Sequence, residues 1–228
     1  IYTFSILFYL FFNKNFNLIY GRFLHGCYVA ALLKYTVIYE SHESILEIKK
    51  HRLLILKKLV RNKHFKKMIV ISNSLKNIYL DNNYFKKITI QVAHDGSDEV
   101  VNFDSKIALL GSKDKLTVGY VGHLYKGRGI KTIISCAKEI NEMTFHIVGG
   151  FNEDIKYWNN YIKNLNLNNI FIYGFVPPKE TLKYKNTFDI LIAPYEKKVS
   201  IQGSGDTSKY MSPLKIFEYM SHKKPIIV

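Results

Sequence analysis

The sequence predicts an α/β fold with two parallel sheets, each covered by helices on both faces. Short apolar segments typical of buried strands alternate with amphipathic helical segments along the chain. The 228 residues are 47% hydrophobic, which is enough to bury a large core. A polar stretch from Asp95 to Asp114 divides the alternation into two series. We therefore expect two Rossmann-like domains, over residues 1–105 and 106–228, with the early strands of the first domain missing.

The first series opens with "IYTFSILFYLFF", which is shorter than the roughly 20 residues that a membrane span needs. We interpret it as a buried helix, and no basic segment or small-residue cleavage site favours a signal peptide. The strands that follow are expected at 17–21, 36–40, 67–72 and 88–94. Helices are expected between them, at 22–35, within 49–67 and at 73–82, the last capped by Ser72 or Asn73.

The second series predicts strands at 115–122, 144–150, 169–176, 189–195 and 225–228. Helices are expected at 129–140, 153–165 and 178–188. A last helix follows Ser212, a natural N-cap, with Pro213 at its first position. The chain begins with Ile1 instead of Met and ends inside a strand, so we expect it to be a fragment that lacks both ends.

Basic residues gather between Lys49 and Lys67, where nine Lys or Arg and no acidic residue occur. Leucines give this run an apolar stripe, and a basic amphipathic helix favours an anionic membrane surface. The alternative is a solvated helix packed by its leucines. Nucleic acid is not an expected partner, because no recognition motif accompanies the charge. Cys27 and Cys136 are expected to be buried free thiols in a reducing cytoplasm, and no metal-ligand spacing occurs.

The stretch "GYVGHLYKGRGI", from Gly119 to Ile130, follows an expected strand and opens an expected helix. Its turn glycines allow close backbone approach, and they are Gly122, Gly127 and Gly129. Lys126 and Arg128 add positive charge where helix amides favour an anion. A phosphate or diphosphate site is one interpretation and a tight turn is the other. The nucleotide-triphosphatase P-loop and the dinucleotide fingerprint are both incomplete.

The final stretch, "SPLKIFEYMSHKKPIIV", places one carboxylate, Glu218, on an otherwise apolar helix. A carboxylate there can accept two hydroxyl hydrogen bonds, as a ribose offers. A salt bridge to Lys215 or His222 is the alternative.

Four segments of the second half together resemble family 4 glycosyltransferases of the GT-B fold. They are "GYVGHLYKGRGI", "FHIVGG", "NIFIYGFVPPKETLKYKNTFDILIAPY" and "SPLKIFEYMSHKKPIIV", in order over about 115 residues. The segments "NLIYGR", "VIYESH", "IVISNSLKNIYL" and "VAHDGSD" resemble the later strands of the acceptor-side domain more loosely. The resemblance implies two domains that face each other across a cleft, with the nucleotide-sugar donor on 106–228 and the acceptor on 1–105.

The resemblance also implies roles for residues. Lys126 would pair with the donor diphosphate and stabilise the leaving group, and Gly122 would let the backbone approach the phosphates. Glu218 matches the second glutamate of the family's Glu, seven residues, Glu motif, which holds the ribose. Arg128, together with the N-terminus of the last helix at Pro213 and Leu214, would complete the donor site. Transfer would proceed with retention of configuration, without a metal or other cofactor.

Two positions depart from the family pattern. Tyr210 stands where the first glutamate of the motif, which contacts the donor sugar, is expected. His123 stands where relatives often carry a second basic residue, and a neutral imidazole would neutralise less charge. His42, in "YESH", falls where relatives place a histidine that faces the donor sugar; it could also be a simple loop histidine. Glu40 could orient His42, and Arg22 could face either substrate.

We therefore expect a retaining hexosyltransferase that acts on a glycan or lipid-linked acceptor in cell-envelope polysaccharide synthesis. It would be cytoplasmic, peripheral on the inner face of the membrane. A nucleotide-sugar epimerase of the same fold and a catalytically silent nucleotide-binding relative remain the alternatives.

Overall fold

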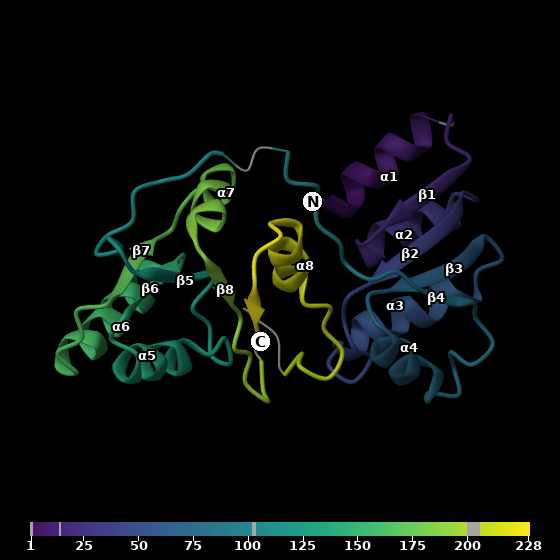
Figure 1. Cartoon of the computed structure of the whole chain (residues 1–228). Coiled ribbons are helices and arrows are strands. Elements are labelled where there is room, and N and C mark those ends of the chain that lie inside the picture. Colours follow the sequence, from purple (N-terminus) through teal and green to yellow (C-terminus); the bar gives the residue numbers. More distant parts are fainter. Residues whose placement is uncertain (1, 14, 102–103, 200–205) are drawn as a thin grey trace. The chain divides into compact units, whose positions relative to one another are not determined.

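The computed structural model describes residues 2–13, 15–101, 104–199 and 206–228, and the chain divides into two compact units (Figure 1). Unit 1 comprises residues 1–95 and 209–212, and unit 2 comprises residues 96–208 and 213–228. The boundary therefore comes at Asp95, ten residues before the position that we expected. Ser105 is tied to unit 2, because its carbonyl accepts a hydrogen bond of 3.1 Å from the Asn186 side chain.

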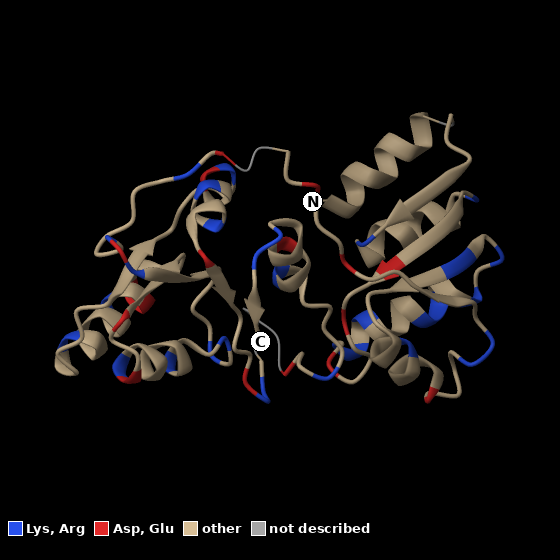
Figure 2. Cartoon of the chain, viewed as in Figure 1, with Lys and Arg blue, Asp and Glu red and all other residues tan. Residues whose placement is uncertain are grey.

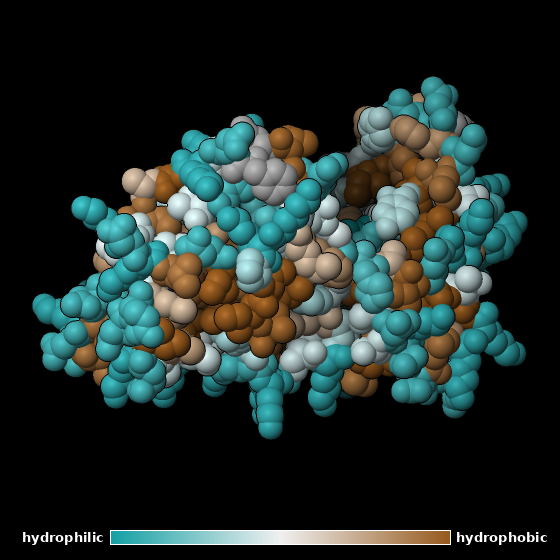
Figure 3. Space-filling view, in the orientation of Figure 1, coloured by the Kyte–Doolittle hydropathy of each residue, from teal (hydrophilic) through white to brown (hydrophobic). Residues whose placement is uncertain are grey.

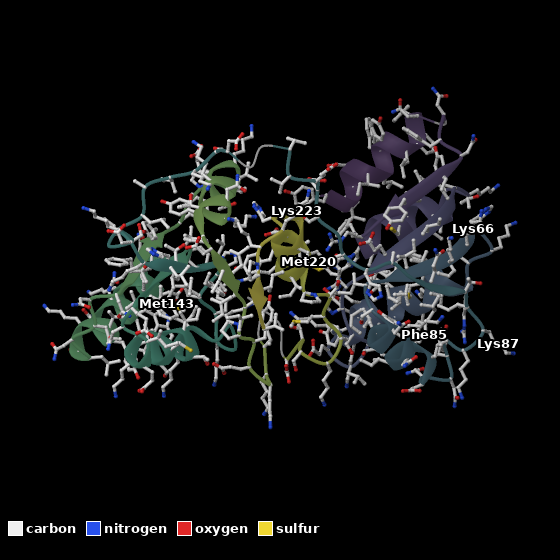
Figure 4. The ribbon with its side chains drawn as sticks, viewed as in Figure 1. Lys66, Phe85, Lys87, Met143, Met220 and Lys223 are labelled. Carbon is white, nitrogen blue, oxygen red and sulfur yellow. The ribbon has the colours of Figure 1, made fainter. Side chains whose placement is uncertain are left out.

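Unit 1 is built on a parallel sheet of four strands, whose order β1-β2-β3-β4 follows the chain. The strands are β1 (Leu18–Gly21), β2 (Thr36–Ser41), β3 (Phe65–Val70) and β4 (Ile90–Val92). The helices are α1 (Tyr2–Phe12), α2 (Leu24–Leu32), α3 (Lys50–Arg61) and α4 (Asn73–Leu80). Because each right-handed connection moves in the same direction, α2, α3 and α4 cover one face of the sheet. Phe85, labelled in Figure 4, is fully buried in this core and packs edge-on against Tyr79.

The helix expected at the start of the chain forms, but the expectation that it is buried is wrong. Leu10 is its one buried residue among those described, whereas Tyr2, Phe4 and Phe8 are each more than two-thirds exposed. Apolar side chains are visible on the surface over α1 in Figure 3. A pattern that is apolar all round does not say which side has a neighbour, and here α2 covers only the side that carries Leu10.

The basic run at 49–67 is not one helix. Helix α3 ends at Arg61, and Asn62 turns the chain by accepting the His64 amide hydrogen bond on its side-chain oxygen, at 2.9 Å. Strand β3 then begins at Phe65, two residues before the expected position. Leu56 and Leu59 of α3 are fully buried, whereas its basic residues are exposed or partly exposed. Figure 2 marks the Lys and Arg positions along this helix in blue. Leu56 and Leu59 of the leucine stripe therefore pack into unit 1, whereas Leu54 is 60% exposed.

Unit 2 is built on a parallel sheet of five strands in the order β7-β6-β5-β8-β9. The strands are β5 (Leu116–Val121), β6 (Met143–Val148), β7 (Ile170–Gly174), β8 (Ile190–Ile192) and β9 (Ile226–Ile227). The helices are α5 (Ile130–Glu139), α6 (Asn152–Asn164), α7 (Pro178–Thr187) and α8 (Leu214–Ser221). The chain runs outward from β5 to β7 and then returns to the other side of β5 at β8. The carboxyl ends of β5 and β8 therefore form the switch point at which such sheets bind ligands.

Two hydrophobic clusters reflect this reversal in direction. One packs α5 and α6 against the sheet around Ile133 and Phe145. The other packs α7 and α8 around Phe188 and Tyr219. Unit 2 is therefore covered on both faces, as the sequence predicted.

Helix caps give one confirmed and one wrong prediction. Ser72 caps α4, because its hydroxyl accepts the Leu75 amide hydrogen bond at 3.1 Å. Ser212 does not cap α8; its hydroxyl accepts the amide hydrogen bond of Asp95 at 3.1 Å, and Pro213 precedes the first helical residue. Sequence distance hid this partner, which lies 117 positions away.

Both cysteines are free, with Cys27 buried and Cys136 only partly buried. No helix in the described part of the chain is both long and apolar enough to cross a membrane. Over the same residues, no group of three or more His, Cys, Asp or Glu side chains could hold a metal ion.

Acidification is expected to destabilise unit 2 through His146. This histidine is fully buried on β6, bonded to Thr144 at 2.9 Å and Tyr173 at 3.0 Å, and burial lowers its pKa to about 4. An unfolded histidine has a pKa near 6.5, so the unfolded chain binds more protons, and stability falls as the pH drops from about 6.5 towards 4. The loss reaches about 2–3 kcal/mol for a shift of this size.

Urea unfolding followed by the fluorescence of Trp158, the one tryptophan, measures this loss in unit 2. His146→Gln should flatten the pH dependence, while the exposed His51→Gln should leave it unchanged. Because His222 also has a pKa lowered to about 4, some dependence should remain in the variant. An equal slope in wild type and His146→Gln would contradict the prediction.

Candidate functional site

Residues 122–129, the glycine loop between β5 and α5, leave the carboxyl end of β5 in a conformation that depends on their glycines. Gly122 has a φ of +149° and Gly129, which precedes α5, has a φ of +75°. A Cβ on Gly129 would lie 1.9 Å from the carbonyl oxygen of Pro194, just beyond β8. The loop is therefore pressed against the neighbouring strand end, directly at the switch point of the sheet.

The two basic residues of this loop lie in different surroundings. Lys126 is exposed and lines a pocket of about 470 Å³ together with Glu196 and Asp206. Arg128 is half-buried, with its guanidinium carbon 5.3 Å from the centroid of the Tyr195 ring. Within the described residues, its buried Nε has no hydrogen-bond partner. Since an unsatisfied buried donor costs about 1–3 kcal/mol, Arg128 is suited to receive an acceptor such as a phosphate oxygen.

Glu218 lies near this loop but has neither of the partners that the sequence suggested. Its Oε2 is 3.4 Å from Nζ of Lys185, on α7. The imidazole of His222 is bonded instead to the side-chain oxygen of Asn186, at 2.8 Å. The side chain of Glu218 remains 37% exposed while that of Lys185 is 10% exposed, so the carboxylate keeps a face for another hydrogen-bond donor.

Lys215 is a site residue that the sequence reasoning considered only as a salt-bridge partner of Glu218. Its Nζ lies 3.5 Å from the centroid of the buried Tyr120 ring on β5. Burial first, and then the charge of Arg128, lower its pKa well below the ordinary value for lysine. The signal in the sequence was a single lysine within the first turn of an apolar helix. Arg128, Lys185 and Glu218 thus all act on the amine of Lys215, and α8 carries residues of both charge signs in Figure 2.

The other expected donor-site residues of unit 2 lie at the surface. His123 is exposed and stacks on Tyr125, with ring centroids 4.8 Å apart. Leu214, the first residue of α8, is 46% exposed after Pro213. Met220, labelled in Figure 4, shows that α8 also keeps an exposed apolar side, since it is 60% exposed.

In unit 1, His42 belongs to a hydrogen-bonded group at the carboxyl ends of β1 and β2. Its Nδ1 lies 2.9 Å from Nη2 of Arg22, and its Nε2 lies 2.5 Å from Oε1 of Glu40. Because arginine only donates, Nδ1 accepts, and Nε2 carries the proton and donates to Glu40. The hydroxyl of Tyr20 donates to the other oxygen of Glu40.

This arrangement fixes the orientation of the His42 ring. Burial acts to raise the pKa of Glu40, but the hydrogen bonds from Tyr20 and His42 outweigh it, so that the pKa is lowered. Glu40 is therefore a carboxylate that holds His42 in one tautomer. Both ring nitrogens are engaged, while the side chain of Arg22 is 64% exposed and offers the accessible charge of the group.

Tyr210 belongs to unit 1 and not to unit 2. It is 5% exposed, its hydroxyl donates to Glu47 at 2.6 Å, and its carbonyl accepts from Ser72 at 2.7 Å. The hydroxyl at the position of the family's first glutamate is thus already occupied within unit 1. The structure brings Arg128, Lys215 and Glu218 together in unit 2, and His42 and Tyr210 lie in the other unit.

Solved structures share this fold at low sequence identity. Sucrose-phosphate synthase from Thermosynechococcus elongatus matches 99% of this chain with a TM-score of 0.67 and 16% identity. HepE of Anabaena, solved in complex with UDP-glucose, matches 98% of the chain with a TM-score of 0.68 and 17% identity. The chain spans 58% and 62% of the length of these two proteins. This likeness shows a fold of the GT-B type, with two Rossmann-like units.

Sequence comparison identifies the family. An uncharacterized glycosyltransferase of Methanocaldococcus jannaschii is 28% identical over 133 residues, which cover 55% of this chain. The matched part is about a third of that relative, at 33% of its length. The model of the family described as glycosyl transferases group 1 matches residues 115–228, which is half of the chain and includes the glycine loop and α8. The chain therefore belongs to the glycosyl transferases group 1 family.

Proposed function

We propose that this chain binds a nucleotide-sugar donor in unit 2 and takes part in transfer of the sugar to a glycan or lipid-linked acceptor. The observation that carries the proposal is that Arg128, Lys185 and Glu218 all act on the amine of Lys215 at the switch point, with Lys185 3.4 Å from Glu218. Arg128 and Lys185 against one carboxylate leave a surplus of positive charge, which a diphosphate would balance. Such preorganised charge also stabilises a leaving diphosphate as the glycosidic bond breaks.

Each residue of the donor site has a proposed role. Arg128 binds the diphosphate, and Lys126 reaches it from the exposed side of the loop. Gly122 gives the phosphates close access to the backbone. Glu218 accepts hydrogen bonds from the ribose hydroxyls on its exposed face. Retention of configuration and independence of a metal follow the family resemblance and belong to the proposal.

Arg128→Met is expected to weaken UDP binding about tenfold or more, because it removes charged hydrogen bonds from a half-buried position. Lys126→Met is expected to weaken it less than about fivefold, because an exposed ion pair contributes only about 0.2–1 kcal/mol. Calorimetry with UDP, GDP and ADP measures both effects and identifies the base. UDP is the first choice because HepE was solved with UDP-glucose.

The outcomes of this titration separate clearly. If one nucleotide binds, and Arg128→Met weakens its binding more than Lys126→Met does, the result supports the proposed donor site. If Lys126→Met loses more affinity than Arg128→Met, the diphosphate binds on the outer side of the loop instead. Failure of all three nucleotides to bind the folded chain would overturn the proposal.

The acceptor is proposed to bind unit 1, where Arg22 and His42 present a charged and oriented group. Contact with an anionic membrane through residues 49–67 is part of the proposal, as is a cytoplasmic location on the inner face of the membrane. Leu56 and Leu59 of α3 pack inside unit 1, so this contact would rest on the basic side chains of α3 and on Leu54, which is 60% exposed.

A catalytically silent nucleotide-binding relative is the second candidate, and Tyr210 is the observation that favours it. A tyrosine whose hydroxyl is held by Glu47 offers no carboxylate to a donor sugar. Release of UDP from UDP-sugars in the presence of glycan acceptors distinguishes the two candidates, because a silent relative binds the nucleotide without turnover.

A further inference from the structure

The amine of Lys215 lies in a space that only a glycine leaves open. A Cβ on Gly122 would lie 2.5 Å from Nζ of Lys215 and 3.1 Å from its Cε. On another side, Nζ lies 3.5 Å from the centroid of the Tyr120 ring, which is 1% exposed. The lysine therefore extends back from α8 and ends directly against the turn after β5, where the proposed diphosphate approaches the backbone.

Charged and titratable groups from four elements act on this amine. They are Tyr120 of β5, Arg128 of the glycine loop, Lys185 of α7 and Glu218 of α8 itself. The one carboxylate among them is already paired with Lys185 at 3.4 Å. The amine of Lys215 thus has two cations and a single anion acting on it, and one of the cations is an arginine, which stays charged.

The balance of these effects disfavours a charged lysine in the free protein. Burial is the largest cause of its lowered pKa, Arg128 and Lys185 add to it, and Glu218 opposes it. The neighbouring His222 gives a second sign of the same positive surplus, because burial and then Lys185 and Lys224 lower its pKa to about 4. An anion placed beside Lys215 would reverse the balance, since an opposite charge within about 4–6 Å favours the charged form.

We propose that Lys215 is a further donor-binding residue, and that its amine takes up one proton from solvent when the donor diphosphate binds beside Gly122. The inference rests on the proposed function, because it assigns the diphosphate to the same site. The chemical change is a proton transfer: one N–H bond forms on the neutral amine as water or buffer gives up the proton, and the resulting ammonium ion pairs with the diphosphate. The Tyr120 ring then faces a cation, which its π-electrons attract.

Proton uptake makes donor affinity depend on pH in a defined direction. When binding raises the pKa of a group, affinity is constant below the pKa of the free protein and falls as pH rises above it. The fall approaches about tenfold per pH unit for one proton and stops above the pKa of the complex. The affinity of wild type for UDP should therefore decrease as pH rises through the range between these two pKa values. Measurements above about pH 7.5 avoid titration of the terminal phosphate, which has a pKa near 6.

Calorimetry of UDP binding at pH 8, in two buffers of different ionisation enthalpy, counts the protons directly. Wild type should take up protons as UDP binds, up to about one per UDP bound. Lys215→Met keeps the apolar stem and removes the amine, so uptake should vanish and affinity should fall about tenfold. Lys215→Arg keeps a charge that does not titrate, so it should bind without uptake and with a flat pH profile. Lys138→Met, at an exposed position near the end of α5, is the matched control and should behave as wild type.

The two proposals fail in different ways. If wild type binds UDP and uptake is equal in wild type and Lys215→Arg, the inference about Lys215 is wrong and the donor site stands. Unchanged affinity in a folded Lys215→Met would likewise exclude the contact. If Lys215→Met does not fold, the arginine variant alone decides between the outcomes. If wild type binds no UDP, GDP or ADP, both proposals are overturned.

Discussion

Gly119→Ala is expected to destabilise unit 2 by about 3 kcal/mol or more, which is a large part of the 5–15 kcal/mol that stabilises a typical domain. Gly119 lies in the middle of β5, paired with His146 of β6 on one side and Leu191 of β8 on the other. A Cβ there would lie 1.9 Å from Cδ2 and 2.2 Å from Cγ of Phe188. Since the strand is held on both sides and Phe188 is fully buried, neither can move away cheaply.

Denaturant unfolding followed by Trp158 fluorescence measures this loss in unit 2. Gly96→Ala is the matched control, because a Cβ at Gly96 has no atom within 4 Å and should cost little. Phe188→Ala removes the clashing ring and is itself destabilising by about 3–5 kcal/mol. Adding Gly119→Ala to that variant should cost little more, because the two positions are coupled. Full additivity of the two losses would show that the ring is not the cause.

Glu218→Ala is expected to weaken UDP binding by about 1.5–3 kcal/mol, or roughly 10- to 150-fold, the range for hydrogen bonds to a charged group. The loss has two sources. The ribose hydroxyls lose their acceptor, and Lys185, with a side chain that is 10% exposed, loses its partner at 3.4 Å. Glu142→Ala, at an exposed position before β6, is the control and should bind UDP as wild type does.

A ligand series separates these two sources. If Glu218 binds the ribose, UDP analogues that lack a ribose hydroxyl should bind wild type more weakly and should lose little further affinity in Glu218→Ala. Equal losses for UDP and the deoxy analogues would show that the carboxylate acts only as the partner of Lys185. Affinity equal to that of wild type would exclude any role of Glu218 at the nucleotide.

The exposed aromatic helix α1 and the basic helix α3 show why burial is hard to predict from a pattern. The apolar run at the start of the chain indicated a buried helix, yet most of its rings are exposed. The amphipathic run of α3 indicated a surface helix, and Leu56 and Leu59 indeed pack into the core of unit 1. In α3 the polar residues indicate which side of the helix faces the solvent. In α1 nothing in the sequence distinguishes the buried side of the helix from the exposed side.

Local sequence reasoning failed where contacts with distant segments determined the structure, as at Ser212 and Tyr210. Ser212 has the residue type of an N-cap, but its hydroxyl is engaged by the amide of Asp95. Tyr210 stands eight positions before Glu218, yet the segment that holds it packs into unit 1 and its hydroxyl binds Glu47. Neither partner can be found by local reasoning, since both lie more than a hundred positions away.

The sequence by itself determined the parallel sheets, the glycine loop after β5 and the single carboxylate on α8. Strand periodicity and turn glycines depend on neighbours within a few residues, so they can be predicted from the sequence alone. Only the tertiary structure decided which cation pairs with Glu218 and that Lys215 ends against Gly122. Lys185 and Glu218 are 33 positions apart on different helices, and the sheet that both helices cover sets the direction of their side chains. The charge balance of the site is therefore a property of packing, because electrostatic effects depend on distances and burial that no local pattern encodes.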